Sequence, residues 1–118
     1  MNAAQFVGHL FLSRDVAHSV HLNTRSFSKH SALNTFYDEI IDLADALAEA
    51  YQGEYSLIET YPTKYSPYSD PILLMDDLRE CVDECAKEFD EADSHLRNIC
   101  DEIRALIAST AYKLRFLK

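Results

Sequence analysis

Histidine and carboxylate side chains recur between residues 26 and 52 at spacings that place them on one side of a helix. The positions that could hold a metal ion, with one asparagine among them, are His30, Asn34, Asp38, Asp42, Asp45 and Glu49. At about 100° of rotation per residue, His30, Asn34 and Asp45 fall at the edge of the apolar stripe. Asp38 and Asp42 fall further round and are expected to face solvent. Imidazole and carboxylate groups together suit iron, manganese or zinc, so the pattern indicates metal binding.

Three more histidines, His9, His18 and His21, precede this stretch. His21 falls on the apolar face of the helix expected there. It could be either a hydrogen-bonded core histidine or a metal ligand. Di-iron bundles commonly use carboxylates on several helices together with Glu-x-x-His pairs. The sequence contains no Glu-x-x-His, so spacing alone does not define a di-iron site.

The three cysteines do not have the spacing of a disulfide framework. Cys81 and Cys85 are one helical turn apart, where thiols commonly pack as small apolar groups. A zinc site there would need two further ligands, and His95 is the one candidate near in sequence.

Four amphipathic helices are expected to position these residues, because apolar side chains recur at steps of three and four. The first spans about residues 3–23. Ser26 is expected to cap the second, which spans about residues 27–52 and should end at Gly53 with positive φ. Asp70 and Pro71 should begin the third helix. A polar interval at residues 90–94 precedes the apolar stripe of the fourth helix. The third and fourth helices could be separate there, or they could form one long bent helix.

One long irregular segment, residues 54–70, lies between the second and third helices. It contains two prolines and four of the chain's seven tyrosines, namely Tyr55, Tyr61, Tyr65 and Tyr68. A connection of this length could span the bundle, which would make the first two helices and the last two separate hairpins. Its tyrosines could either pack against the helices or form a contact surface.

The fold class that follows is all-α: one domain over residues 1–118, folded as an antiparallel four-helix bundle with a long loop between helices two and three.

The chain has 118 residues, two glycines and a net charge of −9, with 11 basic against 20 acidic residues. This balance disfavours nucleic acid as a partner. No apolar run is of membrane length and no signal peptide is evident, so we expect a cytoplasmic protein. Apolar margins on the first helix, at Val7, Phe11 and Leu12, predict a homo-oligomer.

The stretch from His21 to Glu49, HLNTRSFSKHSALNTFYDEIIDLADALAE, resembles the ferroxidase segment of the Dps-type mini-ferritins. The positions that match the family's pattern are His21, Phe27, His30, Asn34, Asp45 and Glu49. The resemblance implies a ferritin-like bundle that binds iron and oxidises it as a ferroxidase. It also implies a site between subunits, with the histidines from one chain and Asp45 and Glu49 from another.

The match departs from the family at three points. Asn34 stands where the family has a carboxylate, Leu22 replaces a tryptophan, and the turn between the two histidines is three residues shorter. The whole sequence, including its ending HLRNICDEIRALIASTAYKLRFLK, also resembles short proteins of tailed bacteriophages. This favours a second hypothesis, in which the metal site is degenerate and the bundle binds a host protein or a virion protein. In a third hypothesis, the polar stripe is only a solvated face of the second helix.

Overall fold

The computed structural model describes residues 1–62 and 70–118, and the secondary structure it describes there is entirely helical. The four helices are α1 (Ala3–Asn23), α2 (Phe27–Glu54), α3 (Pro71–Lys87) and α4 (Ser94–Phe116), with a short 3-10 turn, η1 (Glu91–Asp93), before α4. The expected all-α class is confirmed.

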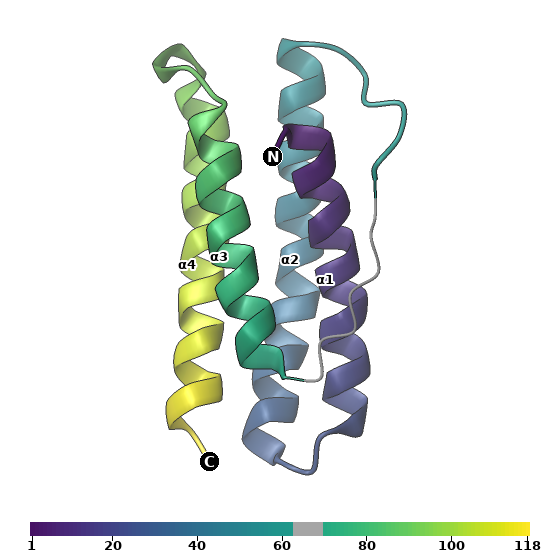
Figure 1. Ribbon diagram of the computed structural model, residues 1–118, viewed down its shortest axis with the longest axis vertical. Coiled ribbons are helices and arrows are strands. Elements are labelled where there is room, and N and C mark those ends of the chain that lie inside the picture. The colour runs from purple at the N-terminus through teal and green to yellow at the C-terminus, as the bar shows by residue number, and fades with distance from the viewer. Residues whose placement is uncertain (63–69) are drawn as a thin grey trace.

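The helices form a bundle in which every neighbouring pair is antiparallel (Figure 1). α1 packs along α2, α2 along α4, α4 along α3, and α3 closes the bundle against α1 over a shorter stretch. α2 ends at one end of the bundle and α3 begins near the other, so these two helices run in the same direction (Figure 1). The prediction of two hairpins joined by a crossover is therefore confirmed.

Polar side chains begin three of the helices. Ser26 Oγ accepts a hydrogen bond from the backbone N–H of Lys29 at the start of α2. Asp70 accepts one from the N–H of Ile72 at 2.9 Å, with Pro71 at the first helical position of α3. Each of these bonds satisfies one of the four N–H groups that a helix start leaves without a partner. Both caps were predicted; the Asn2 capping box of α1 was not.

The predicted role of Gly53 is wrong. α2 continues through Gly53 to Glu54, and neither glycine of the chain has positive φ. Tyr55 occupies the C-cap position, and its backbone N–H bonds to the carbonyl of Tyr51 at 2.9 Å. The last turn of α2 therefore closes with an ordinary backbone bond and does not need a left-handed residue.

α3 and α4 are separate helices, which settles the alternative left open by the sequence. The chain leaves α3 at Lys87 and enters α4 at Ser94 after η1. Arg97 Nε donates to the carbonyl of Phe89 at 2.9 Å and so ties the first turns of α4 to this corner. A side-chain bond to the backbone replaces the glycine or proline that such a turn often contains.

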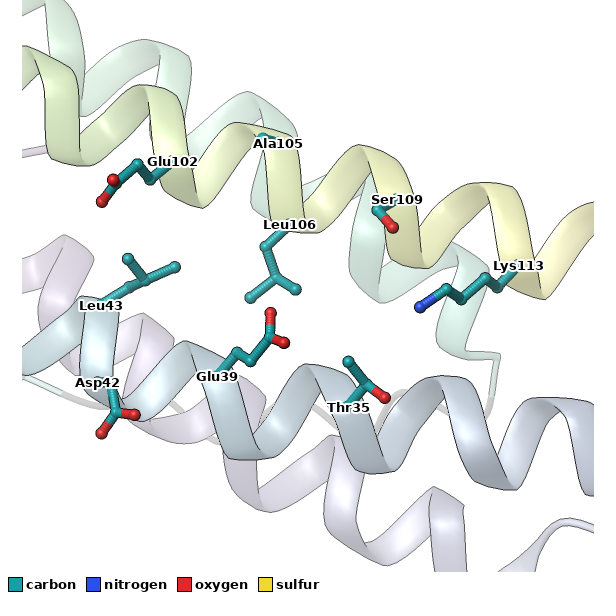
Figure 2. A pocket seen from close by; sticks show the side chains of 9 residues that line it. All are labelled: Thr35, Glu39, Asp42, Leu43, Glu102, Ala105, Leu106, Ser109 and Lys113. Carbon is teal, nitrogen blue, oxygen red and sulfur yellow. The ribbon is translucent and has the colours of Figure 1, made fainter.

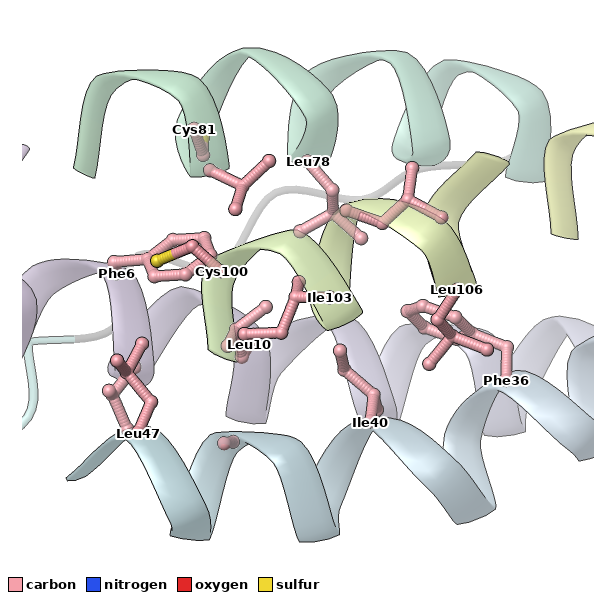
Figure 3. Packing of buried hydrophobic residues seen from close by; sticks show 14 of the residues in the cluster. Phe6, Leu10, Phe36, Ile40, Leu47, Leu78, Cys81, Cys100, Ile103 and Leu106 are labelled. Atoms are coloured by element: carbon pink, nitrogen blue, oxygen red, sulfur yellow. The ribbon is translucent and has the colours of Figure 1, made fainter. Parts of the chain in front are cut away.

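The core lies on the bundle axis and draws side chains from all four helices (Figure 3). Phe6 and Leu10 of α1 and Phe36 and Ile40 of α2 belong to it, and all four are completely buried. α3 and α4 complete the core with apolar side chains that include Leu78, Cys81, Cys100, Ile103 and Leu106.

The segment that follows α2 returns along α1 and contacts it closely at Gly8. A Cβ atom on Gly8 would lie 2.3 Å from the carbonyl oxygen of Pro62. Beside it, the ring of Tyr61 packs against Phe11 with centroids 5.4 Å apart. Tyr61 thus fits the packing interpretation of the loop tyrosines, whereas Tyr65 and Tyr68 lie outside the described residues.

Candidate functional site

His21 and His30 face each other across the turn that joins α1 to α2. His21 lies in the last turn of α1 and His30 in the first turns of α2. Each ring bonds through Nδ1 to the other residue's backbone carbonyl: His21 Nδ1 to His30 O at 2.7 Å, and His30 Nδ1 to His21 O at 2.9 Å. The rings stack with centroids 3.6 Å apart and planes inclined by 21°. The structure therefore brings these two predicted site residues together.

This reciprocal pair fixes the tautomer of both rings. A carbonyl oxygen only accepts hydrogen bonds, so each Nδ1 must carry the hydrogen. In a neutral imidazole that leaves Nε2 with the lone pair. Histidines that bind metals commonly donate the other ring N–H to a carbonyl or carboxylate in this way. Both rings are thus held in the form that could bind a metal through Nε2.

Aromatic side chains surround the pair. Tyr37 meets His21 edge-on, with centroids 5.3 Å apart, and stacks on His18 at 4.4 Å. The guanidinium of Arg14 lies 5.8 Å from the centroid of Tyr37. On the other side, Phe27 lies 6.4 Å from the ring of His30. These contacts restrain the orientation of the histidine rings.

Asn34 lies one helical turn after His30 and is held by two polar neighbours. Its Oδ1 accepts a hydrogen bond from the hydroxyl of Tyr37 at 2.6 Å, and its Nδ2 donates to Asp38 Oδ2 at 3.4 Å. Asp38 and Asp42 are exposed, as predicted. The amide oxygen of Asn34 is therefore on the same side of α2 as the histidine pair, but it carries no charge.

Asp45 and Glu49 are exposed on α2 and lie far from the histidines of the same chain. A helix rises 1.5 Å per residue, so these carboxylates lie about 22 and 28 Å along the axis from His30. One chain does not bring the five predicted ligands together. A site containing all of them would need two chains, as the resemblance to the mini-ferritins implied.

Large apolar side chains are exposed around the end of the bundle that carries the histidine pair. At this end α1 finishes, α2 begins and α4 finishes (Figure 1). Leu22 is 70% exposed, Phe27 82% and Phe116 71%. Ser28 Oγ donates to the carbonyl of Leu117 at 3.2 Å and ties the C-terminal end of α4 to this surface. An apolar surface of this kind commonly marks an interaction site.

Three other potential ligands, His9, Asp77 and Cys81, converge between α1 and α3. Their ligand atoms all lie within 4.8 Å of one another. This cluster was not predicted from the sequence, although Asp77 and Cys81 have the four-residue spacing of helix neighbours. Burial raises the pKa of the Cys81 thiol to about 11, with further contributions from nearby carboxylates, Asp77 first. The thiol is therefore protonated at neutral pH unless a metal displaces its proton.

His95 is not near Cys81, so the one zinc partner considered from the sequence is wrong. It lies instead with Glu54 and Asp93, where its Nε2 is 3.1 Å from Glu54 Oε1. The hydroxyl of Tyr55 donates to Asp93 in the same cluster. That hydrogen bond, followed by burial and nearby negative charge, raises the pKa of Tyr55 to about 12.

A shallow groove runs between α2 and α4 (Figure 2). Glu39 and Asp42 of α2 and Glu102 of α4 border it, with Lys113 at one end. Leu43 and Leu106 form its apolar floor. The groove contains none of the five predicted site residues.

The chain belongs to a family of proteins of unknown function. It is the Family of unknown function (DUF5856), whose model matches residues 21–114. The matched region includes His21, His30, Asn34, Asp45 and Glu49.

The chain is also 27% identical over 120 residues to the "Uncharacterized 14.6 kDa protein in mobD-ri intergenic region" of Enterobacteria phage T4. The alignment covers 95% of this chain and 87% of that protein, which confirms the resemblance to bacteriophage proteins. Neither match is to a ferritin, and no solved structure matches the chain. Within the described residues, none of the helices has the length and apolar character needed to cross a membrane.

Proposed function

We propose that this protein is a ferritin-like bundle that binds ferrous iron between two copies of the chain and promotes its oxidation. His21 and His30 of one copy supply the imidazole ligands, and Asp45 and Glu49 of a second copy supply the carboxylates. Asn34 borders the site. Iron is the substrate here, and each ferrous ion gives one electron to dioxygen or hydrogen peroxide from solution.

The observation that carries this proposal is the reciprocal hydrogen bonding of the two histidines. Both Nδ1 atoms are used by backbone carbonyls at 2.7 and 2.9 Å, which leaves both Nε2 atoms as the lone-pair nitrogens. His30 is half-buried, so a partner chain has access to its ring, whereas His21 is buried.

The position of the carboxylates supports a site built from two chains. Two α2 helices that pack antiparallel, centred near Asp38, would bring His30 of each copy opposite Asp45 and Glu49 of the other. Such a pairing is self-complementary, as a two-fold interface must be. The exposed apolar side chains beside the histidine pair, Leu22 and Phe27, would be covered at the same time.

The connectivity of the bundle supports the ferritin-like part of the proposal. Ferritin-like folds join their second and third helices by one long crossover, whereas simple up-and-down bundles use short loops. Here the connection between α2 and α3 joins opposite ends of the bundle (Figure 1).

Asn34 determines how much charge the site supplies. Asp45 and Glu49 balance the two positive charges of ferrous iron, and the imidazoles are neutral ligands. A carboxylate at position 34 would add a further charge and a bridging ligand for a second ion. With an amide there, we expect one iron per site and slower oxidation than a site with three carboxylates would give.

Iron binding and oxidation test the proposal directly. Ferrous iron is added to the chelator-stripped protein without oxygen, and bound iron is measured after gel filtration. Air or peroxide is then admitted and ferric absorbance is followed. We expect binding and faster oxidation with the wild type, and loss of both in His30→Ala and in Glu49→Ala. Glu39→Ala, which removes an exposed carboxylate on the face of α2 that borders the groove with α4, is the matched control. Oxidation no faster than in buffer would refute the proposal.

The exposed apolar end of the bundle supports a second candidate, a module that binds another protein. Phe27 and Phe116 could equally contact a host or virion protein, and the similarity to a bacteriophage protein is consistent with this role. Light scattering separates the two. A monomer that captures a defined protein from bacterial lysate, and loses it when Phe27 becomes Ser, supports the second candidate. A stable homo-oligomer that Phe27→Ser dissociates supports the first.

A further inference from the structure

A second group of metal-binding side chains lies away from the histidine pair, where α1 meets α3. We infer that His9, Asp77 and Cys81 form a site for a zinc-class divalent cation, which joins the two hairpins of the bundle. This site shares no residue with the iron site proposed above and does not depend on it.

The geometry of the three side chains is close to that of a metal site. His9 Nε2 and Asp77 Oδ2 are 2.9 Å apart, and Cys81 Sγ completes a set whose members are all within 4.8 Å of one another. With Zn–N, Zn–O and Zn–S distances of 2.0–2.3 Å, tetrahedral ligand atoms are separated by about 3.3–3.8 Å. Side-chain movements of about 1 Å would therefore form the site, without any change in the helices.

The chemical types of the ligands define the class of cation. One imidazole, one carboxylate and one thiol are the nitrogen, oxygen and sulfur ligands that zinc binds, and the thiolate disfavours magnesium and calcium. Cys81 is buried, whereas the side chains of His9 and Asp77 are 19% and 36% exposed. The cluster thus opens to solvent on one side, where water can supply the fourth ligand.

The placement of the cluster gives the cation a structural role. Asp77 and Cys81 are one turn apart on α3, and His9 reaches them from α1, so a bound ion would connect the two hairpins. Among the neighbouring helix pairs, α1 and α3 make the least contact with each other. His9 also follows Gly8, on which Pro62 packs. A metal ion here would stabilise the side of the bundle that has the least helix–helix packing.

Within the described residues, one other group of potential ligands, Glu54, Asp93 and His95, lies where α2 ends and α4 begins, and it contains no thiol. This difference allows the two groups to be distinguished by spectroscopy. Cobalt(II) bound by a thiolate gives an intense ligand-to-metal charge-transfer band in the near ultraviolet, and carboxylate and imidazole ligands alone do not. Tetrahedral cobalt also absorbs more strongly in the visible than octahedral cobalt does.

The experiment titrates reduced, chelator-stripped protein with cobalt(II) and then displaces the cobalt with zinc. We expect one equivalent of cobalt with a thiolate band and tetrahedral visible absorption, both removed by zinc. Cys81→Ala should abolish the thiolate band, and His9→Gln should weaken cobalt binding by at least tenfold. His95→Gln is the control and should leave the spectrum unchanged.

Circular dichroism checks that each variant is folded. If Cys81→Ala is unstable, His9→Gln still tests the site, because His9 is only partly buried. The inference is overturned if the wild type gives no thiolate band, or if the band persists in Cys81→Ala. It is also overturned if His9→Gln binds cobalt as tightly as the wild type. Iron oxidation by Cys81→Ala should match that of the wild type, which keeps this result separate from the proposed iron site.

Discussion

His21 and His30 each donate a hydrogen bond from Nδ1 to the backbone carbonyl of the other, so that the end of α1 and the start of α2 are joined twice. The bond from His30 satisfies a carbonyl in the last turn of α1, where helix carbonyls lack partners within the helix. The pair therefore has a structural role in the turn and also leaves the lone pair of each neutral ring on Nε2. These two roles can be separated experimentally.

The structural role predicts that His30→Ala destabilises the protein even without metal. The substitution removes one hydrogen bond and a stacked ring, so we expect a loss of about 1–2 kcal/mol in the free energy of unfolding. Urea denaturation in the presence of a chelator measures it. His18→Ala, which removes a half-buried histidine outside the reciprocal pair, is the control and should cost less. An equal loss in both variants would contradict the structural role of the pair.

The uncharged side chain at position 34 predicts a gain of function in Asn34→Asp. The new carboxylate would still accept the hydrogen bond from Tyr37 and would add a ligand beside His30. We expect more iron bound per chain and faster oxidation than in the wild type. The added charge lies one turn from Asp38, so stability should fall by about 0.2–0.5 kcal/mol. Unchanged iron stoichiometry and oxidation rate in Asn34→Asp would show that position 34 does not limit the site.

The two glycines predict opposite effects of the same substitution. Both lie in helices, where alanine is favoured over glycine by about 1 kcal/mol. Gly53 has no neighbouring atom within 4 Å of an added Cβ, so Gly53→Ala should stabilise the protein. Gly8→Ala would place its Cβ 2.3 Å from the carbonyl oxygen of Pro62, and we expect a net loss of about 1–3 kcal/mol. Thermal unfolding of both variants compares them directly. Stabilisation by Gly8→Ala would mean that the crossover does not pack on α1.

The hydrogen bond from Tyr55 to Asp93 predicts a change in stability at alkaline pH. Tyr55 has a pKa of about 12 in the folded chain against an ordinary value of 10.0. Because the folded pKa is the higher one, this bond contributes fully to stability below pH 10 and its contribution is lost as pH rises toward 12.

Tyrosinate absorbance is measured against pH for the wild type and for Tyr55→Phe. The difference between the two titration curves should give the pKa of Tyr55. Tyr112→Phe removes another exposed phenol and serves as the control for the subtraction. The difference in unfolding free energy between wild type and Tyr55→Phe should be constant up to about pH 10 and then decline. Titration of Tyr55 at its ordinary pKa would show that the bond to Asp93 is not formed in solution.

Much of the fold could be predicted from the sequence, because local patterns determine it. Ser26, Asp70 and Pro71 have side chains or rings that define a helix start on their own, and the apolar spacing identifies the buried faces. Gly53 misled the prediction because glycine is only one of several ways to end a helix. The separation of α3 from α4 depends on the bond of Arg97 to Phe89, which a local pattern does not reveal.

The candidate sites were less predictable, since they depend on contacts between distant parts of the chain. The pairing of His21 with His30 follows from a short turn, and the resemblance already linked the two residues. The cluster of His9 with Asp77 and Cys81 joins residues 68 positions apart and needs the packing of α1 on α3. Whether Asp45 and Glu49 meet the histidines depends on a second chain, which the sequence indicates only through the resemblance.

Mixing two inactive variants shows whether the iron site is shared between two chains. One carries His21→Ala and His30→Ala, and the other carries Asp45→Ala and Glu49→Ala. Each alone should neither bind ferrous iron nor speed its oxidation. When the two are dissociated, mixed in equal amounts and reassociated, half of the random dimers contain both variants, and one of the two sites in each is intact. A site shared between two chains should therefore recover about a quarter of the wild-type oxidation rate. No recovery in oligomers proven to contain both variants would contradict it.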